Sequence, residues 1–206
     1  MSDASQERVV AVLLAAGAAQ RFGSPKQLAE LDGQPLVLHA LDHLRSVPRL
    51  EEILVVVGAH GDEVAAVVEA SGSDVVRVVH CPDWEEGLAA SLRAGVAAAA
   101  AAGAGAVLVH LADLPRVTPQ VIAAILGRAC DGDGRLLGVP VRATYAGLDG
   151  HPVLLPRSSF AAVATLRGDA GAREMLAQPH TRRIEVGHLA DPTDVDTPEH
   201  LESLRS

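Results

Sequence analysis

Residues 9–26 read VVAVLLAAGAAQRFGSPK, and this stretch decides how the rest of the chain is interpreted. Its first six residues form a continuous apolar run, which is typical of a strand covered on both faces of a sheet. A loop of small residues follows and reaches Lys26. Small residues let the backbone approach a ligand closely, and free N–H groups in such a loop can surround a phosphate. The stretch therefore predicts a strand followed by a ligand-binding loop.

Two cations in this loop are chemically suited to phosphate oxygens. Arg21 offers a planar fork of donors, and Lys26 offers a compact positive charge. The spacing matches neither of two known phosphate-binding patterns. Five residues separate Gly17 from Gly23, no Gly-Lys-Ser/Thr follows, and GxGxxG is absent. On spacing alone, an ordinary turn with two solvated cations remains the alternative.

Short β-branched runs alternate with helical patterns along the whole chain. Strands are predicted at 9–14, 53–57, 75–79, 106–111, 136–141 and 182–186, and helices at 36–46, 62–69, 85–102, 119–130, 158–166 and 170–176. This alternation favours the α/β class, with a three-layer α/β/α fold around a mostly parallel, Rossmann-like sheet. We expect one domain over residues 1–206. Ligands of such sheets bind beyond the carboxyl ends of the strands.

Composition excludes several classes of partner. The chain has 206 residues, a net charge of −9 and only 2% aromatic residues, which disfavours binding to nucleic acid or an anionic membrane. The polar N-terminus lacks the apolar core of a signal peptide, and the longest apolar stretch, 94–109, is too short for a membrane span. The two cysteines, Cys81 and Cys130, form no disulfide framework. These features predict a cytoplasmic protein.

Acidic residues follow the predicted strand 106–111 and recur near the C-terminus. Asp113 falls where a carboxylate at the sheet edge could hold Mg²⁺ together with substrate phosphates. Asp196 is a second candidate ligand. The alternatives are a strand-end turn for Asp113 and a helix N-cap for Asp196, with Thr197 and Pro198 opening the last helix.

A pair of histidines, His39 and His43, has the four-residue spacing of a zinc pair on a helix. No HExxH pattern and no third ligand accompany the pair. Val37, Leu41 and Leu44 define the apolar stripe of this helix. We therefore expect both histidines on its solvated face.

Several motifs together resemble the MobA-like nucleotidyltransferases. They are the segment 14–26, Leu111-Ala112-Asp113-Leu114-Pro115, and Asp194-Val195-Asp196-Thr197-Pro198. Three further segments are similar to the molybdenum cofactor cytidylyltransferase (MocA) type: Cys81-Pro82-Asp83-Trp84-Glu85-Glu86-Gly87 with Ser91-Leu92, Gly150-His151-Pro152-Val153, and residues 166–173, LRGDAGAR. The resemblance covers roughly residues 9–204. The chain departs from the family pattern at Ala19, Phe22, Cys81 and Leu114.

The resemblance implies a nucleotide-diphospho-sugar transferase-like fold and a Mg²⁺-dependent transfer of CMP from CTP. CTP is implied by Ala15-Ala16-Gly17 and Pro25-Lys26, and the acceptor is the terminal phosphate of molybdenum cofactor (molybdopterin), with pyrophosphate released. The implied catalytic residues are Arg21, Lys26 and Asp113, and the metal ligands are Asp113 and Asp196. The implied nucleotide-binding residues are Leu14, Ala15, Ala16, Gly17, Gly23, Lys26, Cys81, Gly87 and Ser91. Acceptor recognition falls to Trp84, His151, Asp169 and Arg173.

Partners and alternatives follow from the same resemblance. A molybdoenzyme or its accessory protein is an expected partner. One alternative is another transferase of this fold that moves GMP to molybdenum cofactor or CMP to a sugar or polyol phosphate. Another is an NAD(P)H-dependent reductase of the nicotine-blue type, against which the absence of GxGxxG weighs. The third is a non-catalytic protein that delivers the cofactor.

Overall fold

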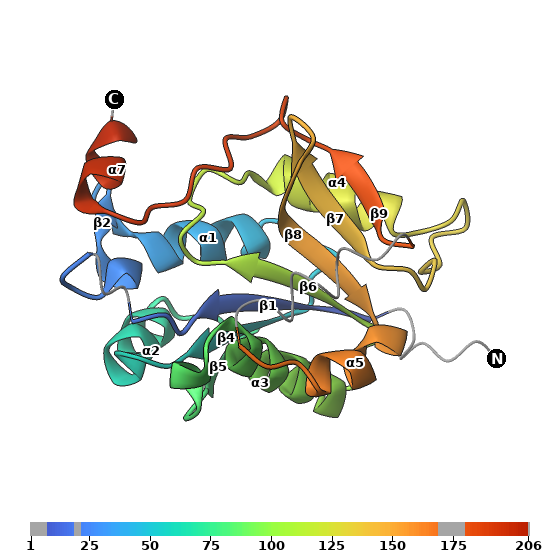
Figure 1. Ribbon diagram of the computed structural model, residues 1–206, viewed down its shortest axis with the longest axis horizontal. Coiled ribbons are helices and arrows are strands. Elements are labelled where there is room, and N and C mark those ends of the chain that lie inside the picture. The colour runs from blue at the N-terminus through green and yellow to red at the C-terminus, as the bar shows by residue number, and fades with distance from the viewer. Residues whose placement is uncertain (1–7, 19–21, 169–179, 206) are drawn as a thin grey trace.

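The computed structural model describes residues 8–18, 22–168 and 180–205, and its centre is a seven-stranded sheet (Figure 1). The strand order is β5-β4-β1-β6-β8-β7-β9. Strands β1 (Val9–Ala15), β4 (Glu52–Val57), β5 (Val76–His80) and β6 (Ala106–Leu111) are mutually parallel. Strand β8 (Leu148–Pro156) runs antiparallel to β6 and to β7 (Val141–Tyr145), and β9 (Arg182–Glu185) is parallel to β7. The sheet is therefore mostly parallel, as the sequence predicts, with one reversed strand.

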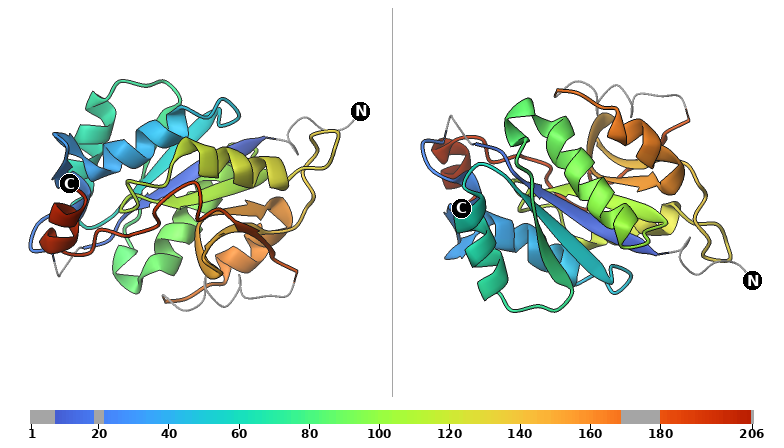
Figure 2. Two further views of the ribbon diagram at one scale, coloured as in Figure 1. Left: turned by 90° about the horizontal axis from the view of Figure 1, so that it is seen from above. Right: turned by 90° about the horizontal axis from the view of Figure 1, so that it is seen from below.

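Helices cover both faces of the sheet and complete three layers (Figure 2). Helices α1 (Leu36–Arg45), α2 (Gly61–Ala70) and α4 (Pro119–Arg128) contribute side chains to the core on one face. Helices α3 (Leu88–Ala101) and α5 (Phe160–Ala164) pack on the other. Strand β1 alternates between the two cores, and all seven of its residues are buried. This double coverage explains the continuous apolar run at the start of the chain.

Helix α3 lies unusually close to the sheet at Gly95. A Cβ atom at this position would come within 2.5 Å of Val12 Cγ1 and 3.0 Å of Val56 Cγ2. Glycine therefore sets the distance between this helix and the two central strands. That distance in turn fixes where the N-terminal end of α3 meets the sheet edge.

Four predicted elements differ from the observed ones by more than one residue at an end. Residues 136–140 are not a strand, because Gly138 adopts φ 69° and Leu136 makes only an isolated bridge to Cys130; the strand begins at Val141. The predicted helix 85–102 is divided by Gly87, whose φ of 96° separates the 3-10 helix η3 (Trp84–Glu86) from α3. Helix α4 ends at Arg128 and α5 at Ala164, two residues earlier than predicted in each case.

Some elements were not predicted at all. Strand β8 contains Gly150 and Pro152, which disguise a strand pattern. The hairpin of β2 (Glu30–Leu31) and β3 (Gln34–Pro35) is too short to give a periodic signal. The predicted helix at 170–176 lies outside the described residues.

The last described helix is α7 (Pro198–Ser203). None of the described helices has the length and apolarity needed to cross a bilayer.

Candidate active site

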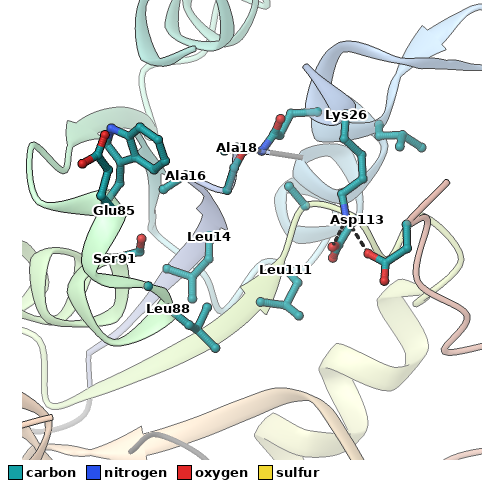
Figure 3. Close-up of a pocket in the computed structure, with 16 residues that line it drawn as sticks. Leu14, Ala16, Ala18, Lys26, Glu85, Leu88, Ser91, Leu111 and Asp113 are labelled. Carbon is teal, nitrogen blue, oxygen red and sulfur yellow. Dashed lines mark hydrogen bonds and ion pairs between the residues drawn. The ribbon is translucent and has the colours of Figure 1, made fainter. Parts of the chain in front are cut away.

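A cleft of 640 Å³ opens at the carboxyl ends of β1 and β6, where the parallel topology predicts a ligand site (Figure 3). We call it the main cleft. Its floor comes from the ends of the two strands, and one wall comes from η3 and the start of α3. The opposite wall comes from the 3-10 helix η2 (Lys26–Leu28) and the C-terminal segment. The lining residues are Leu14, Ala16, Gly17, Ala18, Lys26, Gln27, Leu36, Trp84, Glu85, Gly87, Leu88, Ser91, Leu111, Ala112, Asp113 and Asp196.

Lys26 joins two carboxylates from distant parts of the chain. Its Nζ atom lies 2.7 Å from Asp113 Oδ2 and 3.0 Å from Asp196 Oδ1, and Figure 3 shows these contacts as dashed lines. Three predicted site residues that span 170 positions of sequence therefore meet at one point. Chain order alone does not reveal this proximity; it follows from the strand order of the sheet.

Backbone hydrogen bonds hold the three side chains in place. Ala112 N donates to Leu14 O at 3.1 Å, which extends the β1–β6 pairing up to Asp113. Val195 N donates to Asp113 O at 3.0 Å and fixes the segment that carries Asp196. The N-cap of α7 is Thr197, whose hydroxyl accepts from His200 N, so the N-cap interpretation of Asp196 is wrong. The Asp196 carboxylate faces Lys26 instead.

The electrostatics favour a charged lysine. Burial disfavours the ammonium, but the charges and hydrogen bonds of Asp113 and Asp196 outweigh it and raise the pKa of Lys26. The lysine side chain is 12% exposed, and those of Asp113 and Asp196 are about a quarter exposed. Asp113 Oδ1 is buried and accepts no hydrogen bond from the described residues. An oxygen in that state is suited to a cation, and two carboxylates beside open space are the donor set that Mg²⁺ shares with phosphates.

The loop after β1 approaches the neighbouring strand end closely. Ala59 N donates to Ala16 O at 3.1 Å, and Gln27 Nε2 donates to Gly17 O at 2.8 Å. A Cβ atom on Gly58 would lie 2.5 Å from Trp84 Cβ and 2.8 Å from Ala16 Cβ, so only glycine fits there. Gly58 and Gln27 thus shape the cleft, although neither was among the predicted site residues. The sequence offered one signal for each: Gly58 directly follows a predicted strand, and Gln27 directly follows Lys26.

The predicted nucleotide-binding residues separate into three groups. Leu14, Ala16, Gly17, Lys26, Gly87 and Ser91 line the main cleft. Ala15 and Cys81 are buried behind it; burial raises the pKa of the Cys81 thiol, which Ser91 contacts. Gly23 does not line the main cleft, and its φ of 75° marks a turn. Arg21, which was predicted as a catalytic residue, lies outside the described residues.

The predicted acceptor residues also divide. Trp84 lines the main cleft. His151 lines a neighbouring pocket of 510 Å³, where burial lowers its pKa to about 4 and keeps it neutral. Asp169 and Arg173 lie outside the described residues.

The His39 and His43 pair has local protein partners. His39 Nε2 lies 2.7 Å from Leu31 O, and His43 contacts the backbone of Val117, while burial lowers its pKa. Both rings are partly buried, so they do not lie on a fully solvated face of the helix as expected. In the described ranges, no group of three or more His, Cys, Asp and Glu side chains forms a metal cluster.

Comparison with known proteins places the chain in a family. A family model described as MobA-like NTP transferase domain matches residues 11–184. The chain belongs to this family. The match covers both the loop after β1 and the Asp113 segment, and it makes the chain a member of a nucleotidyltransferase family.

Relatives of the MobA-like family carry more than one activity in their names. Nicotine blue oxidoreductase of Paenarthrobacter nicotinovorans is 33% identical over 99% of this chain and 100% of its own. The 2-C-methyl-D-erythritol 4-phosphate cytidylyltransferase of Rubrobacter xylanophilus is 34% identical over 76% of this chain and 67% of its own. The crystal structure of Rv0371c from Mycobacterium tuberculosis has a TM-score of 0.78 at 28% identity, covering 96% of this chain and 98% of that one. Rv0371c has also been solved in complex with manganese, with a TM-score of 0.72.

Proposed function

We propose that the protein is a divalent-metal-dependent cytidylyltransferase, which moves CMP from CTP to the terminal phosphate of molybdenum cofactor. The observation that carries the proposal is the contact of Lys26 with Asp113 and Asp196 at the mouth of a small-residue loop. A cation held between two carboxylates, beside open space, suits a site that exchanges a metal and a triphosphate. Membership of the MobA-like family and the motifs of the cytidylyl type support the proposal.

The chain's own groups position the reactants and offset charge. The triphosphate lies along the backbone of Ala16 and Gly17, with Lys26 turning from the carboxylates to the phosphate oxygens. Asp113 and Asp196 would hold Mg²⁺, which neutralises developing charge when bound. An anionic oxygen of the acceptor phosphate attacks the α-phosphorus in line. The bond from the α-phosphorus to its bridging oxygen breaks, and pyrophosphate leaves with that electron pair.

No general base is required for this step, because the attacking phosphate oxygen is already ionised. Positioning and charge neutralisation carry the rate instead. One feature of the cleft also supports the proposed preference for a pyrimidine base. The buried Ala16 methyl lies in a confined part of the cleft, against the β4 end at Gly58 and close to Trp84.

A reductase is the second candidate function, and one observation favours it. Nicotine blue oxidoreductase aligns with this chain over almost the full length of both. The loop after β1 lacks the GxGxxG pattern of a dinucleotide site, however, and its Lys26 contacts two carboxylates. The two candidates make opposite demands on metal ion and NADPH, which separates them in one assay.

The test supplies purified protein with CTP labelled at the α-phosphorus, Mg²⁺ and molybdopterin that carries molybdenum. We expect label to transfer to the acceptor and pyrophosphate to appear, with GTP a poor substitute. Asp113→Asn should reduce the rate by about 10²-fold or more, because it removes a charge from the reacting centre. Asp62→Asn, the same change on the exposed start of α2, should leave the rate unchanged. NADPH-dependent dye reduction without label transfer would contradict the proposal.

A further inference from the structure

The second pocket, of 510 Å³, adjoins the main cleft. The two share Leu14, Leu88 and Leu111, which form the boundary between them. Most of its wall is apolar and comes from α3, β6, β8 and the loop after β6. The wall residues of this kind are Leu92, Val109, Leu114, Val153 and Leu155, with Leu148 at 75% exposure on the rim. Such a wall fits the faces of a flat, largely apolar ring.

A charged pair, Arg142 and Asp149, belongs to the polar lining of this pocket, together with His151 and Asp194. Arg142 on β7 is 7% exposed in its side chain, and its Nη1 donates to Asp149 Oδ2 at 3.1 Å. Arg183 Nε donates to Asp149 Oδ1 at 2.9 Å. Hydrogen bonds from Arg183, with the charge of Arg142, hold the pKa of Asp149 below its usual range. Asp149 therefore stays ionised and places an acceptor beside a donor.

The carboxylate retains capacity for another ligand. A carboxylate has about four acceptor positions, and the two arginines use three of those of Asp149. Oδ1 accepts from Arg183 Nε, and Oδ2 accepts from Arg142 Nη1 at 3.1 Å and from Arg183 Nη2 at 3.4 Å. One position on Oδ1 therefore remains. Its side chain is 36% exposed, so it is open to the pocket and to solvent. Burying an arginine in apolar surroundings costs free energy, and apolar side chains in place of the Arg142–Asp149 pair would often stabilise the fold equally well. A pair kept there despite that cost suggests a recognition role.

The hairpin that carries this pair is fixed in shape. Glu185 accepts the backbone N–H groups of Ala146 and Gly147, each at 3.0 Å. Tyr145 Oη donates to His151 O at 2.7 Å, across the two strands. A Cβ atom on Gly150 would lie 2.7 Å from the Tyr145 ring, so this strand contact is tight. The donor and acceptor are thus preorganised before any ligand arrives.

We propose that the second pocket binds the ring end of the acceptor and reads a 2-amino-4-oxopyrimidine edge, as a pterin presents. Asp149 Oδ1 would accept one hydrogen bond from the exocyclic amine, and Arg142 would donate to the ring carbonyl. The apolar wall would cover the ring faces. This inference rests on the proposed function and names the residues that distinguish its acceptor from others. The main cleft then holds the nucleotide, and the acceptor phosphate reaches across the boundary at Leu88 and Leu111.

The inference is tested by pterin fluorescence, titrated with protein in the absence of nucleotide. We expect wild type to bind pterin and Asp149→Asn to bind it about 10-fold to 100-fold more weakly, as for loss of a hydrogen bond to a charged group. Lumazine, which has a carbonyl in place of the amine, should bind wild type with the same weakness. Asp62→Asn is the matched control and should bind pterin like wild type.

Three results would overturn the inference. One is equal pterin affinity in wild type and Asp149→Asn. Another is lumazine binding as tightly as pterin to wild type, a comparison that needs no variant to fold. The third is guanosine, which has the same edge, binding more tightly than pterin in an Asp149-dependent way; the pocket would then hold a nucleobase.

Stabilisation by CTP with Mg²⁺ separates this inference from the function it rests on. The Asp149→Asn variant should retain that stabilisation, since Asp149 does not line the main cleft. Loss of pterin binding with the CTP response intact would remove only the present inference. Absence of any CTP response in wild type would remove the proposed function itself.

Discussion

The Lys26 ammonium contacts both proposed metal ligands, Asp113 and Asp196. The lysine would therefore compete with a metal ion for these two carboxylates. Lys26→Met removes that competing cation and leaves two facing carboxylates without their lysine. In the absence of nucleotide, we expect Mn²⁺ to bind Lys26→Met about tenfold more tightly than wild type, because the positive charge of Lys26 no longer repels the metal ion. CTP should bind more weakly, because the lysine also serves phosphate.

Electron paramagnetic resonance of Mn²⁺ measures this affinity without any turnover. Lys26→Arg keeps the charge and is the matched control, with Mn²⁺ affinity close to wild type. Mn²⁺ binding to Lys26→Met that is unchanged or weaker would show that the lysine does not compete with the metal.

Among the helices, α3 and α4 offer a matched pair of glycines. Gly95→Ala in α3 forces a methyl group against Val12 and Val56 and should cost about 1–3 kcal/mol of unfolding free energy, despite better helix propensity. Gly127→Ala in α4 meets no atom within 4 Å and should stabilise by up to about 1 kcal/mol. Urea unfolding measures both. If Gly95→Ala instead stabilised the protein as much as Gly127→Ala, that result would contradict the close approach of α3 to the sheet.

Glu185, the last residue of β9, accepts hydrogen bonds from the turn between β7 and β8, and this contact depends on pH. N–H donors from Gly147, Gly187 and Ala146, with the Thr144 hydroxyl, lower its pKa to about 2 from 4.5. Its stabilising effect is therefore complete above about pH 4.5 and is lost as the pH falls toward 2. Glu185→Gln should lower the unfolding midpoint at pH 7 and flatten the decline between pH 4.5 and 2. A variant with the same acid profile as wild type would show that this contact carries no stability.

Across the molecule, the sequence predicted what lies in contiguous segments. The β1 strand and the strand that ends before Asp113 each have a local pattern, so their structure followed from the residues. Strand β8 did not, because Gly150 and Pro152 interrupt its pattern while its pairing with β6 is a tertiary property. The same holds for Gly58 against Trp84, and for Arg142 with Asp149, whose roles depend on which elements become neighbours.

The central claim is that the main cleft binds a nucleoside triphosphate with a divalent metal at Asp113. Thermal unfolding of wild type and Asp113→Ala with CTP, GTP, ATP or NADPH, with and without Mg²⁺, tests it most directly. A ligand at about 100 times its dissociation constant adds about 2.7 kcal/mol, a rise of about 5–10 °C in Tm for this size of chain. We predict that rise with CTP and Mg²⁺ in wild type and its loss in Asp113→Ala. A rise with NADPH alone, indifferent to metal and to Asp113, would contradict the account.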